Sequence, residues 1–120
     1  MNQILNVLRD RGSRYAVSGG GVADEAAVTA LLAEVKRNKK FAKATHNTWA
    51  VLFSDGTPLK NDDGEAGAAM AILRMLERDG ITDHVVIVTR WFGGVHLGGD
   101  RFRHVTTCVR EYLDQFCKAD

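Results

Sequence analysis

Three carboxylates stand in one short run in the middle of the chain, and their chemistry suits acid–base catalysis or metal binding. They are Asp62, Asp63 and Glu65. Carboxyl groups act as general acids and bases, and carboxylate oxygens bind divalent cations, here together with the imidazole of His46. The same residue types are common where a helix begins, because carboxylates accept hydrogen bonds from free N–H groups and complement the helix dipole. A helix cap is therefore the favoured interpretation, and a metal site with His46 is the alternative.

No established catalytic pattern occurs elsewhere in the sequence. The G-x-S-x-G turn of α/β-hydrolases is absent. The chain contains four histidines, and none of them lies in an H-E-x-x-H or another zinc-binding spacing. Cys108 is expected in the middle of a helix, where a small core residue explains it better than a nucleophile does. We therefore predict that the chain is not an enzyme and has no catalytic residues, no bound metal and no cofactor.

A glycine-rich segment follows the most apolar run of the chain. Residues 85–89 (VVIVT) predict a central strand buried on both faces, which Arg90 and Trp91 end at a rim. The glycines that follow are Gly93, Gly94, Gly98 and Gly99. Asp100 is then expected to cap a helix over residues 102–116. A helix N-terminus after glycines suits an anion, but neither the P-loop nor the G-x-G-x-x-G pattern occurs. A structural turn that borders an interaction surface is favoured.

The densest positive charge lies just after a predicted helix. Its members are Lys36, Arg37, Lys39, Lys40 and Lys43, and Phe41 lies inside the run. Lysine and arginine contact phosphates, and a base can stack on an aromatic ring, which indicates an RNA or ribosome contact. The RNA-binding alternative would also use three later arginines, Arg101, Arg103 and Arg110, and the sequence does not place the two basic segments on one face. A solvated helix end is favoured instead, because the formal net charge of the chain is only +1.

Length and composition predict one soluble domain. The chain has 120 residues, of which 45% are hydrophobic and 26% are charged. The first residues contain too few apolar side chains for a signal peptide or a membrane span, so we expect no membrane partner. Cys108 and Cys117 would lie on opposite sides of the last helix, which favours a reducing, cytoplasmic location. The sequence favours no oligomeric state.

Apolar periodicity predicts helices and strands in alternation. Residues 2–9 are expected to form a short helix or a frayed extension within an N-terminal segment 1–12. A strand over 14–18 should end in a turn or bulge at Gly19, Gly20 and Gly21. The later elements are a helix capped by Asp24, a strand over 44–53 with a short partner, a helix that ends at Asp79 and Gly80, the central strand and the last helix. This order predicts an α+β fold, a two-layer α/β sandwich.

Three ordered motifs resemble the Impact family, a widespread domain also seen in the bacterial YigZ proteins. They are residues 44–47 (ATHN) before a strand, 62–65 (DDGE) before a helix, and 88–94 (VTRWFGG) followed by Leu97 and Gly98. The likeness runs from around Ser13 to around Leu113. Two features are closer to the eukaryotic form: residues 66–70 (AGAAM), and the sequence Asp100, Arg101, Phe102 with His104.

The resemblance implies a fold and a function. The fold is that of ribosomal protein S5 domain 2, as a single domain over residues 1–120. Eukaryotic members carry an RWD domain before this one, and bacterial members carry a second domain after it; neither is present in this chain. Eukaryotic members restrain the amino-acid-starvation response by competing with its kinase for the kinase's ribosome-associated activator, and no enzymatic activity is established for the family.

The implied function is thus a non-enzymatic interaction module in translation control, which binds a protein partner or the ribosome. Two alternatives stay open: a domain that binds RNA or the ribosome directly, and a metal-dependent, hydrolase-like enzyme that uses His46 and the cluster at 62–65.

The resemblance also implies a shared polar surface. Its candidate members are Thr45, His46, Asn47, Asp62, Asp63, Glu65, Arg90, Trp91, Gly93, Gly94, Arg101 and His104. A structural alternative is mutual pairing, in which Arg90 or Arg101 binds Asp63 or Glu65 across the glycine turn.

Overall fold

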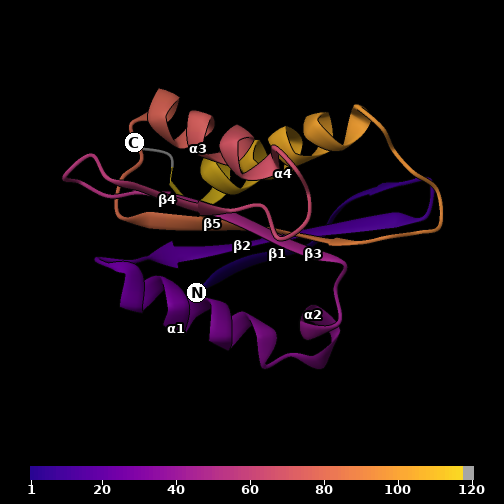
Figure 1. The fold of residues 1–120 in the computed structure, drawn as a ribbon, viewed down its shortest axis with the longest axis horizontal. Helices are drawn as coiled ribbons and strands as arrows, with labels where there is room; N and C mark the ends of the chain where they lie inside the picture. The colour runs from indigo at the N-terminus through magenta and orange to yellow at the C-terminus, as the bar shows by residue number, and fades with distance from the viewer. Residues whose placement is uncertain (118–120) are drawn as a thin grey trace.

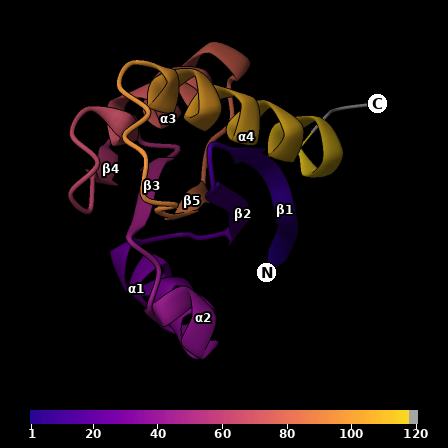
Figure 2. The same cartoon turned by 90° about the vertical axis from the view of Figure 1, so that its right-hand side faces the viewer.

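The computed structural model describes residues 1–117, which form one sheet with helices on both of its faces. In chain order the elements are β1 (Asn2–Asp10), β2 (Ser13–Gly21), α1 (Glu25–Lys36), α2 (Lys39–Ala42), β3 (His46–Leu52), β4 (Pro58–Asn61), α3 (Ala68–Asp79), β5 (His84–Trp91) and α4 (Asp100–Phe116). The strand order is β1-β2-β5-β3-β4, and each neighbouring pair is antiparallel. Helices α3 and α4 cover one face, and α1 and α2 cover the other (Figure 1 and Figure 2). The predicted α+β class is confirmed. The predicted two-layer arrangement is wrong, because helices cover both apolar faces of the sheet.

β5 is the central strand, as its apolar run predicted. Val86 and Val88 belong to the core under α3 and α4, whereas Val85 and Ile87 belong to the core against α1 and α2. All four side chains are buried. Successive side chains of a strand point to opposite faces, so a run without polar residues fits a strand that is covered on both sides.

The first residues form an edge strand, and the predicted helix or frayed extension is wrong. β1 pairs with β2, and its register is irregular between Ile4 and Leu8. Asn6 lies inside this irregularity with a φ of 51°. Ile4, Val7 and Leu8 all pack against the core under α4. In a regular strand, side chains alternate between the two faces of the sheet. The bulge interrupts this alternation, so Ile4, Val7 and Leu8 reach the same face although their spacing is that of a helix.

Gly19, Gly20 and Gly21 lie within β2, where a turn or bulge was predicted. They pair with residues 84–86 of β5. A Cβ atom at Gly19 would meet the hydroxyl of Tyr112 at 2.5 Å. Glycine is therefore needed here because a side chain of α4 lies directly on the backbone of the strand.

Helix ends match the predictions in part. Asp24 caps α1, and its Oδ1 accepts a hydrogen bond from the first turn at 2.9 Å. Gly80 ends α3 in the left-handed conformation. Asp100 is not the cap of α4 but its first residue; Gly99 holds the cap position without a side-chain bond. The carboxylate of Asp100 pairs with Arg11 instead, at 2.6 Å.

The other predicted elements are present with shifted ends. The strand over 14–18 is the longer β2, the strand over 44–53 is β3, and its short partner is β4. Within residues 1–117 no helix has both the length and the apolar character needed to cross a membrane.

The residues of the candidate functional site lie at one end of the sheet. β5 finishes there at Trp91, which is paired with Arg14 of β2. Arg90 lies between Tyr15 of β2 and His46 of β3. The glycine-rich loop and the first turn of α4 close over the same region (Figure 2). We call this region the Trp91 end of the sheet.

Candidate functional site

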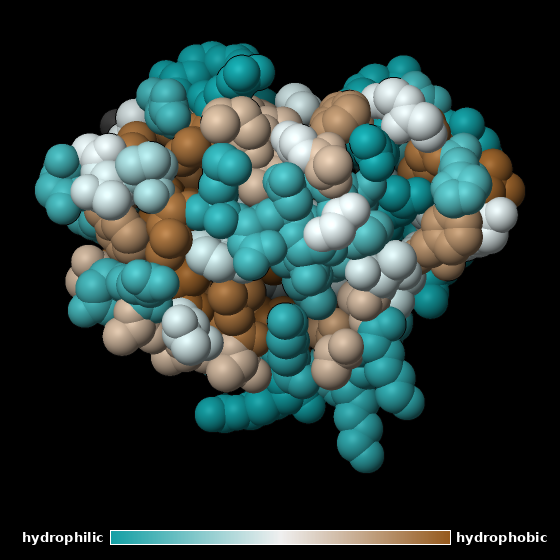
Figure 3. Space-filling model, viewed as in Figure 1, coloured by the Kyte–Doolittle hydropathy of each residue, from teal (hydrophilic) through white to brown (hydrophobic). Residues whose placement is uncertain are grey.

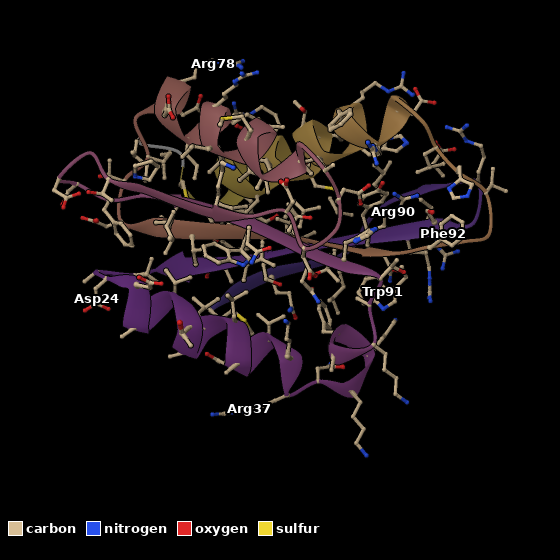
Figure 4. All side chains as sticks on the ribbon, in the orientation of Figure 1. Asp24, Arg37, Arg78, Arg90, Trp91 and Phe92 are labelled. Carbon is tan, nitrogen blue, oxygen red and sulfur yellow. The ribbon has the colours of Figure 1, made fainter. Side chains whose placement is uncertain are left out.

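The three sequence motifs meet at the Trp91 end. Thr45 precedes β3 and residues 46–47 begin it, residues 62–65 precede α3, and residues 92–99 join β5 to α4. Hydrogen bonds link them: the Thr45 hydroxyl accepts from the Phe92 N–H at 2.9 Å, and Asp63 contacts the start of β3. Figure 4 shows Arg90, Trp91 and Phe92 grouped at this end.

Glu65 is the centre of a buried group of side chains, which we call the Glu65 cluster and which also contains His46, Arg90 and Arg101. Arg90 Nη1 donates to Glu65 Oε1 at 2.9 Å, and the exposed fractions of the two side chains are 7% and 3%. Arg101 Nη1 lies 3.7 Å from the same oxygen, and this side chain is 34% exposed. The predicted pairing of arginine with Glu65 is confirmed. Within residues 1–117, Asp63 forms no ion pair with either arginine.

His46 closes the Glu65 cluster on the side of β3. Its Nδ1 lies 2.7 Å from the backbone oxygen of Asp63. Because a carbonyl oxygen only accepts, Nδ1 carries a proton. Nε2 faces Glu65 Oε2 at 3.8 Å. The neutral ring has no proton on Nε2 for Glu65, so His46 adds positive charge to the cluster only when it is protonated.

Asp62 and Asp63 hold the loop before α3 in place. Asp62 accepts from the backbone N–H groups of Ala69 at 2.9 Å and Gly67 at 3.2 Å. These bonds, led by that from Ala69, hold the pKa of Asp62 below its usual range. Asp63 accepts from the backbone N–H of Asn47 at 2.6 Å. The capping interpretation is thereby confirmed for Asp62. Within residues 1–117, no three His, Cys, Asp or Glu side chains are grouped so as to hold a metal ion.

Asn47 points into the molecule and joins β3 to its neighbours. It is buried; its Nδ2 donates to the backbone oxygen of Phe41 at 3.1 Å, and its Oδ1 accepts from the Thr89 hydroxyl at 2.6 Å. Both polar atoms of the amide are therefore used in structural hydrogen bonds.

Trp91 and the glycines fix the shape of the rim. Trp91 Nε1 donates to the backbone oxygen of Lys40 at 2.9 Å. A Cβ atom at Gly93 would collide with the backbone of Gly12, so the β1–β2 hairpin lies directly on the glycine-rich loop. Gly94 has a φ of 94° and open space around it.

His104 belongs to a separate group, which we call the Asp10 cluster and which also contains Asp10, Arg11 and Asp100. His104 Nε2 donates to Asp10 Oδ2 at 2.7 Å. Arg11 Nη2 donates to Asp10 at 2.9 Å and to Asp100 at 2.6 Å. Hydrogen bonds from Arg11, and then from His104, hold the pKa of Asp10 well below its usual range.

Tyr15 lies between the two clusters. The centroid of its ring is 5.6 Å from that of His104 and 6.0 Å from Arg90 Cζ. The residue is fully buried, and its hydroxyl has no hydrogen-bond partner among the described residues. Burial raises the pKa of Tyr15 to about 12.

The basic run lies on the face covered by α1 and α2. Its exposed members are Lys36, Arg37, Lys39, Lys40 and Lys43. Figure 3 shows long hydrophilic side chains that project into solvent below these helices. Phe41 is buried, with its ring centroid 5.1 Å from that of Trp91, so it offers no face to a base. Arg110 belongs to α4 on the other face and pairs with Asp79 and Asp114. Arg110 is therefore separated from the basic run by the sheet.

Two apolar residues of the rim were missed by the sequence analysis. Phe92 and Val95 have exposed fractions of 42% and 47%. The signal for them is local, because both residues flank the Gly93 and Gly94 pair in a surface loop. Asp10 and Arg11 were also missed, because their partners other than each other, His104 and Asp100, lie in α4.

Comparison with known proteins places these features in a family. Residues 11–113 match the Impact N-terminal domain. Protein IMPACT homolog of Caenorhabditis elegans is 36% identical over 114 residues, which cover 89% of this chain and 44% of the relative. Protein IMPACT of Bos taurus is 38% identical over 111 residues, which cover 88% of this chain and 35% of the relative. The chain thus spans less than half the length of either relative.

Two solved structures share the architecture. One, described as a hypothetical protein, has a TM-score of 0.80 at 21% identity and is matched over 94% of this chain and 56% of its own, which shows the fold alone. The other is the two-domain translational regulator Yih1, with a TM-score of 0.55 at 32% identity over 88% of this chain and 43% of its own. With its Impact N-terminal domain and its eukaryotic relatives, the chain belongs to the Impact family.

Proposed function

We propose that this chain is a non-enzymatic interaction module of a translational regulator, and that it acts in the response to amino-acid starvation by binding a protein partner. The observation that carries this proposal is the Trp91 end, where the three family motifs converge around two exposed apolar side chains, Phe92 and Val95. Large apolar side chains that stay exposed beside a polar rim are typical of protein-interaction sites.

The chemistry of the site supports binding rather than catalysis. Asp62, Asp63 and Glu65 each accept a hydrogen bond that holds a segment of the fold in place, which gives all three a structural role. Burial raises the pKa of the Cys108 thiol to about 12. Burial likewise raises the pKa of Cys117. A nucleophilic cysteine needs the opposite shift.

The same proposal places the protein in the cytoplasm, where ribosomes translate, and assigns its sheet to the class of ribosomal protein S5 domain 2. Both statements extend the family membership and the likeness to the translational regulator Yih1.

The test is affinity capture from a cell lysate with this chain as bait, before and after ribonuclease treatment, and with partners identified by mass spectrometry. Arg101→Ala is the test variant. Arg78→Ala is its matched control, since Arg78 is an exposed arginine of α3 on the far side of the molecule (Figure 4).

The expected result is capture of translation-control proteins that survives ribonuclease, is lost with Arg101→Ala and is kept with Arg78→Ala. If only ribosomal material is captured and ribonuclease removes it, the chain is an RNA-binding domain and the basic run is the next place to mutate. Equal capture by both variants would move the binding surface away from the Trp91 end.

A further inference from the structure

We propose that the Trp91 end binds an acidic segment of the partner protein, one that carries an apolar side chain among its carboxylates. This inference rests on the proposed function and adds the chemical class of the partner. Phe92 and Val95 would receive the apolar side chain, and Arg101, together with the arginines of the β1–β2 hairpin, would receive carboxylates.

The Glu65 cluster has more positive charge than its own carboxylate balances. Arg90 and Arg101 both approach Oε1 of Glu65, at 2.9 Å and 3.7 Å. The Nε atoms of both arginines are buried and have no hydrogen-bond partner among the described residues. Another chain cannot reach these buried Nε atoms. The side chain of Arg101 is 34% exposed, however, so the accessible N–H groups at its end are able to bind a second carboxylate.

Aromatic rings hold these arginines in position before any ligand arrives. Arg101 Cζ lies 4.8 Å from the ring centroid of Phe102, and Arg90 Cζ lies 5.7 Å from that of Phe92. Such cation–π contacts restrict the long side chains. Binding then loses less side-chain entropy than it would with freely rotating arginines.

The apolar part of the surface adjoins the charged part. Phe92 directly follows the strand that carries Arg90, and its ring is 5.2 Å from that of His96. Val95 is exposed on the same loop. An apolar contact beside a cation suits a peptide that presents an apolar side chain next to a carboxylate.

The wider charge pattern favours an acidic partner at this end rather than at the opposite end of the sheet. The hairpin forms a shallow hollow of about 340 Å³ whose lining includes Arg9, Arg11 and Arg14. At the opposite end of the sheet, where β2 and β3 finish, a hollow is lined by Asp24, Glu25, Asp55 and Asp83 among others. The net charge of +1 therefore conceals a basic end and an acidic end. Fields of opposite sign orient a charged partner as it approaches.

The rim fits discrete carboxylates better than the continuous backbone of RNA. Asp10 and Asp100 lie among its arginines, and both accept hydrogen bonds from Arg11. Asp63 lies beside the Glu65 cluster. A phosphate chain that followed this rim would pass these carboxylates and be repelled, whereas a short acidic segment can place its charges between them.

The experiment measures binding of three fluorescein-labelled synthetic peptides to the full chain by anisotropy. The first contains glutamate and leucine, the second has glutamine in place of every glutamate, and the third has serine in place of every leucine. A labelled oligouridylate of equal charge is the nucleic-acid probe. The variants are Arg101→Ala and Phe92→Ser, with Arg78→Ala and Met70→Ser as matched controls, because Arg78 and Met70 are exposed residues of α3.

The expected result is that the glutamate–leucine peptide binds about tenfold or more tightly than either altered peptide and than the oligouridylate. Arg101→Ala and Phe92→Ser should each weaken it by about tenfold, as loss of one charge-assisted hydrogen bond or one apolar anchor predicts, and the controls should not. Unchanged urea midpoints would show that the variants are folded. The Nε–H resonances of Arg90 and Arg101 in NMR spectra should shift as this peptide is added.

Equal binding of the glutamine peptide, equal binding by the Arg101→Ala variant, or tighter binding of oligouridylate would each overturn the inference. The proposed function fails separately. If translation-control proteins are captured from lysate but the glutamate–leucine peptide does not bind, the proposed function is supported and the inference of an acidic partner is wrong. If the peptide binds as expected but no translation-control protein is captured, the inferred surface for an acidic segment is supported and the proposed function is wrong.

Discussion

The Glu65 cluster and the Asp10 cluster both anchor the first turn of α4, but they differ in how deeply their charged groups are buried. In the first, one buried carboxylate faces two arginines. In the second, Asp10 and Asp100 share Arg11, and Asp10 and Arg11 have exposed fractions of 26% and 42%. A buried ion pair that loses one partner leaves an uncompensated charge, whereas water replaces a lost partner at the surface. The comparison teaches that the Glu65 cluster decides whether the site folds, and the Asp10 cluster adjusts how firmly the hairpin is held.

The largest expected effect comes from removing the shared carboxylate. Glu65→Ala should lower the free energy of unfolding by about 3–5 kcal/mol, because Arg90 stays buried without its partner. Urea denaturation followed by circular dichroism measures the loss. The double variant with Arg90→Met should recover part of it, since no buried charge is then left unpaired. A loss below about 1 kcal/mol for Glu65→Ala would show that Arg90 finds another partner or reaches water.

The contact between the hairpin and the glycine-rich loop is the next most sensitive point. Gly93→Ala should cost about 1–3 kcal/mol, because the new methyl group would overlap the backbone of Gly12 and force the two segments apart. Gly99→Ala is the matched control, since Gly99 has negative φ and a Cβ atom added there would meet no other atom within 4 Å. Equal unfolding midpoints for the two variants would contradict the close approach.

The contribution of the Asp10 cluster to folding stability should depend on pH. The pKa of Asp10 is lowered in the folded state from its ordinary value of 3.8, so its contribution is complete above about pH 4 and declines as the pH falls toward the folded-state value. Asp10→Asn should therefore be less stable than the wild type at pH 7, and the two urea midpoints should converge in acid. A constant difference from pH 7 down to about pH 2 would exclude this ion-pair role.

The smallest expected effect concerns Tyr15, which lies between the clusters. Its hydroxyl is buried without a partner among the described residues, so Tyr15→Phe removes an unsatisfied polar group and keeps the ring against His104 and Arg90. Stability should stay within about 1 kcal/mol of the wild type or rise. A larger loss, measured by the same urea titration, would mean that a bound water or an unrecognised partner satisfies the hydroxyl.

Much of this architecture follows from local patterns in the sequence. The apolar run at 85–89 determines a strand covered on both faces, and the pairing of Glu65 with Arg90 and Arg101 was foreseen as one alternative. β1 was missed because its bulge at Asn6 turns a strand pattern into apparent helical spacing. The triple glycine was assigned to a turn or bulge because the side chains that lie on Gly19 and Gly20, Tyr112 and Leu31, come from helices elsewhere in the sequence.

The candidate site was predicted less completely for the same reason. Asp62 accepts a hydrogen bond from the helix that follows it, so its capping role can be predicted from the neighbouring sequence. The bond between Asp10 and His104 joins the first strand to the last helix, and no local pattern announces it. The exposure of Phe92 also depends on where the loop leaves the sheet.

The irregular pairing of β1 has a consequence for how another chain can approach. β1 is one edge of the sheet, and the other edge, β4, is a four-residue strand that begins with Pro58. One edge strand contains a bulge, and the other is short and begins with proline. Neither edge therefore offers an incoming strand a long straight row of free N–H and C=O groups for pairing. Added strands, and the aggregation that follows from them, are discouraged along both sides, which leaves the ends of the strands as the places where recognition can occur.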